Sequence, residues 1–125
     1  MSNPSKRKGT SFEVLIRDYF IDQTGDDRIV RLALAGVKDC GDIANFRIGD
    51  SKIAVECKAT DEYRSSLAGW VKEAEREAEN LGALASIVVH KRKGKGAAQD
   101  QYVTLTVGDF FRVLRASGGG GSVLR

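Results

Sequence analysis

The chain has 125 residues, of which 42% are hydrophobic and 30% are charged, and its formal net charge is +3 at neutral pH. This composition is typical of one small α/β or α+β domain with a modest core. The sequence contains no apolar run long enough to span a membrane, and the polar, basic start of the chain is unlike a signal peptide. One histidine and two cysteines without a CxxC pattern argue against a zinc site and fit a reducing cytosol.

The first half of the chain predicts a helix followed by strands. We expect residues 1–9 to form a disordered basic arm. Thr10-Ser-Phe-Glu13 matches a capping box, which predicts that a helix begins at Thr10 and runs to about residue 22. Residues 29–34 read as a strand. Residues 42–48 and 52–58 are joined by Gly49-Asp50-Ser51, which predicts a β-hairpin.

The second half predicts a crossover helix, further strands and a last helix. Apolar residues at helical spacing predict a helix over residues 66–81 that ends at Gly82. Residues 84–90 are apolar throughout, as in a strand buried in the middle of a sheet. Residues 101–107 alternate as in a strand, residues 109–116 suit a short helix that Asp109 would cap, and residues 117–125 suit a flexible glycine-rich tail.

The expected order is α-β-β-β-α-β-β-α, with residues 10–116 forming one domain. The crossover helix after the third strand predicts a parallel pair of strands, whereas the hairpin is antiparallel. The sequence therefore predicts the α/β class, with a mixed central sheet flanked by helices.

The predicted hairpin brings charged residues together at one end. Side chains at alternate positions of a strand face the same side, so Glu56 and Lys58 share one face and Cys57 points to the other. A turn centred on residues 49–51 places Asp42 opposite Cys57 or Lys58, and opposed side chains lie about 5 Å apart. Asp42, Glu56 and Lys58 are therefore expected to converge.

This convergence indicates a metal site. Two carboxylates at such a distance repel each other unless a cation lies between them. Carboxylate oxygens, together with the backbone carbonyl of Cys57, are ligands that suit Mg²⁺. Lys58 would orient a water nucleophile or stabilise charge on a phosphate. The alternative is an ion-pair cluster at the edge of the sheet, which contributes little to stability.

Asp42 followed, after a hairpin, by Glu56-Cys57-Lys58 resembles the PD-(D/E)XK nuclease signature. The element order resembles the restriction-endonuclease-like core of that superfamily, over about residues 8–114. The opening Lys8-Gly9-Thr-Ser-Phe-Glu13 is similar to that of small archaeal-type and phage Holliday junction resolvases. The chain departs from the pattern at Gly41, where proline is common, and at Val14, where the archaeal resolvases carry arginine.

The resemblance implies a structure-selective DNA endonuclease that uses Mg²⁺, for which Mn²⁺ would substitute. It implies that Glu13 joins Asp42, Glu56 and Lys58 as a catalytic residue and binds metal with Asp42, Glu56 and the Cys57 carbonyl. Glu13 could instead be the capping partner of Thr10, or pair with Arg17. Symmetric cutting of a four-way junction requires two sites related by a two-fold axis, so a homodimer is expected.

Two alternatives stay open: a nicking or exonucleolytic nuclease of the same fold, and a DNA-binding module that does not cut. The resemblance implies a protein of the cytoplasm, associated with the nucleoid, in a prokaryotic or phage-infected cell. It also implies a role in DNA recombination or repair.

Clusters of basic residues are candidates for DNA contact, because they attract polyanions by counterion release. Charge runs are also common as solvated surface. Trp70 is expected in the core, with base stacking as an alternative, and Tyr63 could also reach DNA. The candidate DNA-binding residues are Lys6, Arg7, Lys8, Arg64, His90, Lys91, Arg92, Lys93 and Lys95.

Overall fold

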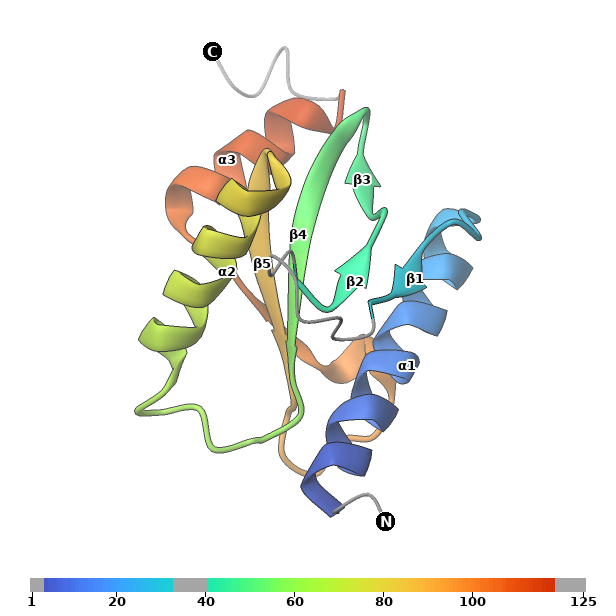
Figure 1. The fold of residues 1–125 in the computed structure, drawn as a ribbon, viewed down its shortest axis with the longest axis vertical. Helices are drawn as coiled ribbons and strands as arrows, with labels where there is room; N and C mark the ends of the chain where they lie inside the picture. The colour runs from blue at the N-terminus through green and yellow to red at the C-terminus, as the bar shows by residue number, and fades with distance from the viewer. Residues whose placement is uncertain (1–3, 33–40, 119–125) are drawn as a thin grey trace.

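The computed structural model describes residues 4–32 and 41–118 (Figure 1). The elements are α1 (Pro4–Thr24), β1 (Val30–Arg31), β2 (Ile43–Ala44), β3 (Arg47–Ile48), β4 (Ser51–Lys58), α2 (Leu67–Leu81), β5 (Ala85–His90), the 3₁₀ helix η1 (Ala98–Asp100), β6 (Tyr102–Thr104) and α3 (Val107–Ala116). Within this part of the chain, no helix is both long and apolar enough to cross a bilayer.

The strands form one mixed sheet in the order β1-β2-β4-β5-β6, with β3 paired to β4 beside β2. β4 and β5 are parallel, and the other neighbouring strands are antiparallel. The α/β class and the parallel pair flanking the crossover helix are therefore confirmed. Because β4 and β5 run in parallel with Lys58 beside His90, the two strands end side by side.

The two faces of β4 differ in character. Val55 and Cys57 pack with Phe12 and Ile16 of α1 in the hydrophobic core. The alternate positions of β4 face α2, which lies on the other side of the β4–β5 pair (Figure 1). As predicted, Cys57 therefore packs as a small hydrophobe while Glu56 faces the other way.

The first helix begins earlier than predicted. Residues 4–9 were expected in a disordered arm, but α1 begins at Pro4, so Thr10 lies inside the helix and does not cap it. Proline suits the first turn of a helix because it has no N–H to leave unpaired there. Residues 1–3 and 119–125 of the predicted arm and tail lie outside the described residues.

A bulge interrupts the strand that leads away from Asp42. Ile43 pairs with Val55, and Arg47 pairs with Lys52. Between these two pairs the chain advances four residues from Ile43 to Arg47, while β4 advances only three. One extra residue is therefore inserted opposite β4, as in a β-bulge. The backbone N–H of Asp42 donates to the carbonyl of Val55, the partner of Ile43. The predicted register, with Asp42 opposite Cys57 or Lys58, would pair Ile43 with Glu56 or Cys57, so it was wrong by one or two positions.

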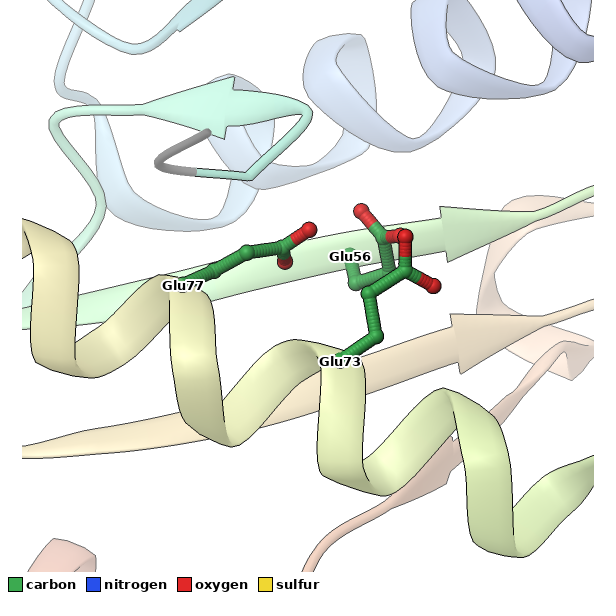
Figure 2. Close-up of side chains that lie close together, drawn as sticks. All are labelled: Glu56, Glu73 and Glu77. Atoms are coloured by element: carbon green, nitrogen blue, oxygen red, sulfur yellow. The ribbon is translucent and has the colours of Figure 1, made fainter. Parts of the chain in front are cut away.

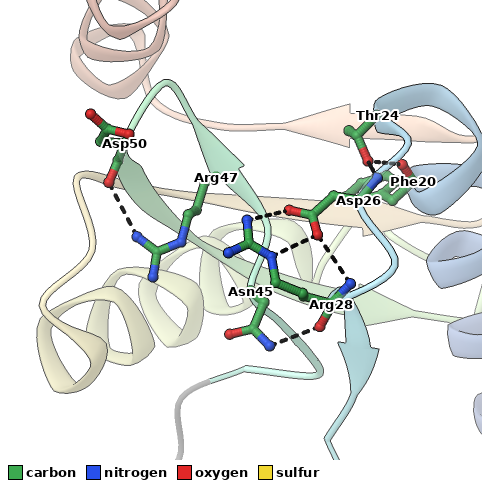
Figure 3. A network of polar contacts seen from close by, with 7 residues as sticks. All are labelled: Phe20, Thr24, Asp26, Arg28, Asn45, Arg47 and Asp50. Atoms are coloured by element: carbon green, nitrogen blue, oxygen red, sulfur yellow. Dashed lines mark hydrogen bonds and ion pairs between the residues drawn. The ribbon is translucent and has the colours of Figure 1, made fainter.

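The bulge is fixed from the side by the turn after α1 (Figure 3). Asn45 has a positive φ of 71°, a conformation that asparagine tolerates better than most residues. Its side-chain amide donates to the carbonyl of Arg28 at 2.8 Å, and Arg28 donates to Asp26. These contacts hold the bulge in place, and the bulge sets the register of Asp42.

The second half of the chain mostly follows the prediction. Gly82 ends α2 in the left-handed conformation with φ of 70°, and β5 is buried along its whole length. The cap of α3 was predicted wrongly. Thr106 is the N-cap residue, and Asp109 is buried instead, accepting a hydrogen bond from the backbone N–H of Ser86 at 3.0 Å. The Asp109 carboxylate thus provides an acceptor for the N–H of Ser86, which lies on β5 before the residues that pair with β6.

Candidate functional site

The centre of the site is a pair of carboxyl groups on adjacent strands. Asp42 lies just before β2, and its carboxyl group is close enough to that of Glu56 on β4 to raise the pKa of Glu56. A backbone contact orients Asp42, because the backbone N–H of Cys57 donates to its Oδ2 at 2.8 Å. N–H and C=O of one strand residue point the same way, so the Cys57 carbonyl is directed toward the same edge.

Gly41 allows Asp42 to approach β4 this closely. Its φ is +103°, and a Cβ atom added there would lie 2.9 Å from the carbonyl oxygen of Val55. The backbone N–H of Asp42 donates to that same oxygen at 2.8 Å. Glycine is therefore required at the position where the nuclease signature commonly has proline.

The environment of Glu56 favours its protonated form. Its side chain is 5% exposed. Burial, the hydrogen bond with Asp42, and the nearby charges of Asp42 and Glu77 raise the pKa of Glu56 to about 11, although Lys58 opposes the rise. In the absence of a metal, Glu56 therefore holds a proton at neutral pH and shares it with Asp42.

Lys58 lies between two glutamates. Its Nζ is 3.2 Å from Oε2 of Glu56 and 2.8 Å from Oε1 of Glu73 on α2. Burial by itself lowers the pKa of Lys58, but the hydrogen bond to Glu73, together with the contact with Glu56, raises it above its ordinary value. Lys58 is therefore an ammonium at neutral pH, able to donate hydrogen bonds but not to act as a base.

Two glutamates of α2 join the site, and the sequence analysis missed both. Glu73 and Glu77 extend from α2 toward Glu56, and ligand atoms of these carboxylates lie within 4.8 Å of one another (Figure 2). Glu77 is fully buried. Both residues follow Trp70 at helical spacing on the face that contains Ala74 and Ala78. Acids at inward-facing positions were the signal that could have identified them.

Glu13, on α1, lies near Asp42. Its charge is close enough to Asp42 for the two carboxylates to raise each other's energy, and burial is the main reason that the pKa of Glu13 is raised. The side chain of Arg31 donates to Glu13 at 2.7 Å and offsets part of this cost. The expected alternative partners were wrong: Arg17 pairs with Asp18, and Thr10 does not cap the helix.

A pocket opens the site to solvent beside Glu13 and Asp42. Its volume is about 450 Å³, and Arg31 and Lys6 also line it. Lys6 is in the first turns of α1 together with Arg7 and Lys8, where all three are exposed. The basic residues predicted as a disordered arm are thus held in a helix next to the carboxylates.

The basic loop after β5 is held by internal hydrogen bonds. Gln101 accepts from the backbone N–H of Arg92 and donates to the carbonyl oxygens of Lys95 and Ala97. The ammonium of Lys91 is directed into the loop, where it donates to the carbonyl oxygens of Arg92 and Lys95. Lys91 therefore shapes the loop, while Lys93 and Lys95 are exposed to solvent.

His90 does not suit its predicted role as a phosphate contact. It is 2% exposed, and its Nε2 is hydrogen-bonded to Thr104 at 2.8 Å. Burial lowers its pKa, so the ring is neutral and provides no positive charge. Trp70, predicted in the core, is partly buried and packs against the His90 ring at 5.7 Å between centroids.

The residues present fit a divalent cation. Two carboxyl groups this close favour a proton or a cation between them, and the oxygens of Asp42, Glu56 and the Cys57 carbonyl are hard ligands of the kind Mg²⁺ prefers, with Glu13 near Asp42. The carboxylates of α2 form a second candidate ligand group with Glu56. Because the ammonium of Lys58 already lies between Glu56 and Glu73, the Asp42 side is favoured.

Comparison with protein-family models, curated proteins and solved structures gives no match.

Proposed function

We propose that this chain is a Mg²⁺-dependent DNA endonuclease of the PD-(D/E)XK type that hydrolyses phosphodiester bonds. The observation that carries the proposal is the geometry around the end of β4: Asp42 accepts from the backbone N–H of Cys57 at 2.8 Å, and the ammonium of Lys58 lies 3.2 Å from Glu56. The order of the elements, with β4 and β5 parallel across α2, supports a restriction-endonuclease-like core.

Each residue has a distinct role in this proposal. Asp42, Glu56 and the Cys57 carbonyl would hold Mg²⁺, with Mn²⁺ as a substitute, and Glu13 would contribute from α1. Bound there, the metal supplies Lewis-acid stabilisation and a more acidic water. Lys58 stays protonated and donates hydrogen bonds to the attacking water or to the phosphate oxygens. Glu73 keeps the Lys58 ammonium beside Glu56.

The basic surface next to the site supports DNA as the substrate. Exposed basic residues lie at the start of α1 and in the loop after β5, and Lys8 and Lys91 line one small pocket between these segments. A backbone tracking across this surface would pass the carboxylates. Branched DNA such as a four-way junction is the substrate that the resemblance favours, which implies action in recombination or repair in the cytoplasm of a prokaryotic or phage-infected cell.

An apolar surface supports the proposed homodimer. Val107, Phe110 and Phe111 of α3 are 76%, 47% and 40% exposed, and Val103 of the neighbouring edge strand β6 is 53% exposed. Exposed apolar patches of this kind are typical of protein contacts. A second copy placed on this surface by a two-fold axis would provide the paired sites that symmetric cutting requires.

Cleavage of labelled DNA tests the proposal. The purified chain is incubated with a four-way junction and with a linear duplex of matched sequence, in Mg²⁺ and in EDTA, beside Glu56→Ala. Glu75→Gln, on the exposed side of α2, is the matched control. We expect paired nicks in the junction with Mg²⁺ for the wild type and the control only. Equal cutting of the duplex would support a general nuclease, and binding without cutting would support a DNA-binding module.

A further inference from the structure

Four aromatic rings gather where β5 ends. His90 lies within 5.3–5.7 Å, between centroids, of Tyr63, Trp70 and Tyr102. Tyr63 and Tyr102 also meet edge to face at 6.1 Å. The rings come from three separate segments: the loop after β4, α2, and the β5–β6 pair. The cluster is therefore a feature of the tertiary structure.

The cluster has an inner and an outer layer. His90 is 2% exposed and forms its base, whereas Tyr63 and Tyr102 are 37% and 39% exposed. The Nδ1 atom of His90 has no hydrogen-bond partner among the described residues. We name the two outer rings, Tyr63 and Tyr102, the tyrosine platform. Covering His90 explains why rings surround it. It does not explain why Tyr63 and Tyr102 are also exposed to solvent.

The tyrosine platform lies next to the carboxylate site. His90 pairs with Lys58 in the parallel register, and the backbone N–H of Lys91 donates to the carbonyl of Lys58 at 3.1 Å. Trp70 is one turn before Glu73, the partner of Lys58, on the same face of α2. A strand whose phosphate lies at Lys58 would therefore have its neighbouring nucleotide beside the platform.

The charges around the tyrosine platform match a nucleotide. The guanidinium carbon of Arg92 lies 5.6 Å from the centre of the Tyr102 ring. A pocket of about 370 Å³ beside Tyr63 is lined by Arg64 and Lys93, which suit a phosphate, and by Asp61 and Glu62. The two acids would repel a phosphate, but they accept hydrogen bonds from base amino groups.

We propose that the tyrosine platform stacks on an unpaired nucleobase of the DNA substrate, one nucleotide away from the phosphate that is cut. This inference rests on the proposed function and extends it, because it assigns the enzyme to DNA that contains an unpaired or unstacked base, such as a branch point or gap. Aromatic rings accept any base, since every base has a π-face, so no sequence preference follows from this contact.

The test measures binding in EDTA, so that it does not depend on cleavage. Duplexes with and without a short gap carry 2-aminopurine, whose fluorescence falls when it stacks, at the gap. Tyr63→Ala and Tyr102→Ala are compared with Tyr63→Phe, which keeps the ring, and with Tyr19→Ala, which removes the chain's third tyrosine from α1. Melting temperatures check that each variant is folded.

We expect wild type, Tyr63→Phe and Tyr19→Ala to quench the fluorescence of the gapped DNA. We expect each platform alanine variant to bind gapped DNA about 5- to 150-fold more weakly, the range for loss of one stacked base. Binding of the fully paired duplex should change by less than about twofold, because the phosphate contacts remain.

Two results would overturn the inference: gapped DNA bound equally well without the rings, or equal losses on gapped and paired DNA, which would mean that the rings only shape the loop. A separate Mg²⁺ cleavage assay on the same DNA distinguishes the two proposals. Intact cleavage with no effect of the rings rejects the tyrosine platform alone. Ring-dependent quenching with no cleavage by the wild type rejects the endonuclease alone.

Discussion

β4 and β5 run side by side and end at the same edge of the sheet, yet their ends differ in electrostatics. At the end of β4, Glu56 is buried against Asp42 and has its pKa raised to about 11. The loop after β5 carries exposed basic residues and is held by Gln101. The first region needs a proton or a cation to be stable, whereas the second already satisfies its own polar groups. We infer that chemistry belongs to the first and DNA affinity to the second.

The largest expected effect separates the two regions. Asp42→Asn should slow Mg²⁺-dependent cleavage about 1,000-fold, the scale on which preorganised charge contributes to catalysis. The Kd for DNA in EDTA should change by less than about twofold, because the proposed phosphate contacts come from basic residues and not from the Asp42 carboxylate. Single-turnover cleavage and fluorescence anisotropy measure the two quantities. A variant that cleaves normally, or that loses binding in proportion to cleavage, would contradict the separation of catalysis from DNA affinity.

A smaller effect is expected where the backbone brings Asp42 to β4. Gly41→Ala should lower the free energy of unfolding by about 1–3 kcal/mol, the cost of forcing a side chain into a left-handed backbone conformation. Gly69→Ala is the control, because it lies in α2 with nothing within 4 Å of the added Cβ, and it should stabilise by up to about 1 kcal/mol. Urea unfolding measures both variants. A neutral effect of Gly41→Ala would contradict the close approach of Asp42.

The pH dependence of stability tests the state of Glu56. A carboxyl group whose pKa is raised on folding contributes stability below its ordinary value, near 4.5, and loses it as the pH rises toward about 11. Wild type in EDTA should therefore melt at a lower temperature at pH 9 than at pH 6.

Glu56→Gln removes this ionisation. The melting temperature of the variant, relative to that of wild type, should therefore rise with pH, by about 4–8 °C for each 1 kcal/mol. The exposed Glu75→Gln is the control. A constant difference across this pH range would show that Glu56 is not protonated in the folded state.

The smallest effect is expected in the basic loop. Lys93→Gln and Lys95→Gln should each reduce the slope of log K against log salt by about one, while cleavage at saturating DNA stays unchanged. Lys52→Gln, exposed on β4 near the Gly49 turn, is the matched control and should leave the slope unchanged. If the loop variants slowed cleavage at saturation, the loop would take part in the chemistry.

The sequence predicted the elements that have strong periodicity or strong turn signals. α2 and β5 were predicted closely, since one has an apolar stripe with a glycine cap and the other is apolar throughout. The meeting of Asp42 and Glu56 followed from the Gly49 turn. Its register did not, because the bulge at Asn45 depends on a contact with the distant carbonyl of Arg28.

The remaining misses also have tertiary causes. Glu73 and Glu77 were not predicted as site residues, because glutamates on a helix are usually exposed. Only the position of α2 over Glu56 makes them part of the site. The basic residues before Thr10 have the composition of a disordered arm, but the helix that begins at Pro4 includes them.

The central claim is that Asp42 and Glu56 exchange their shared proton for a divalent cation. Anomalous diffraction from crystals soaked in Mn²⁺ tests it most directly. We expect one strong peak at coordination distance, about 2 Å, from oxygens of both Asp42 and Glu56, and no peak in Glu56→Gln crystals. A peak among Glu56, Glu73 and Glu77 with Asp42 left out, or no ordered Mn²⁺ at saturating concentration, would contradict it.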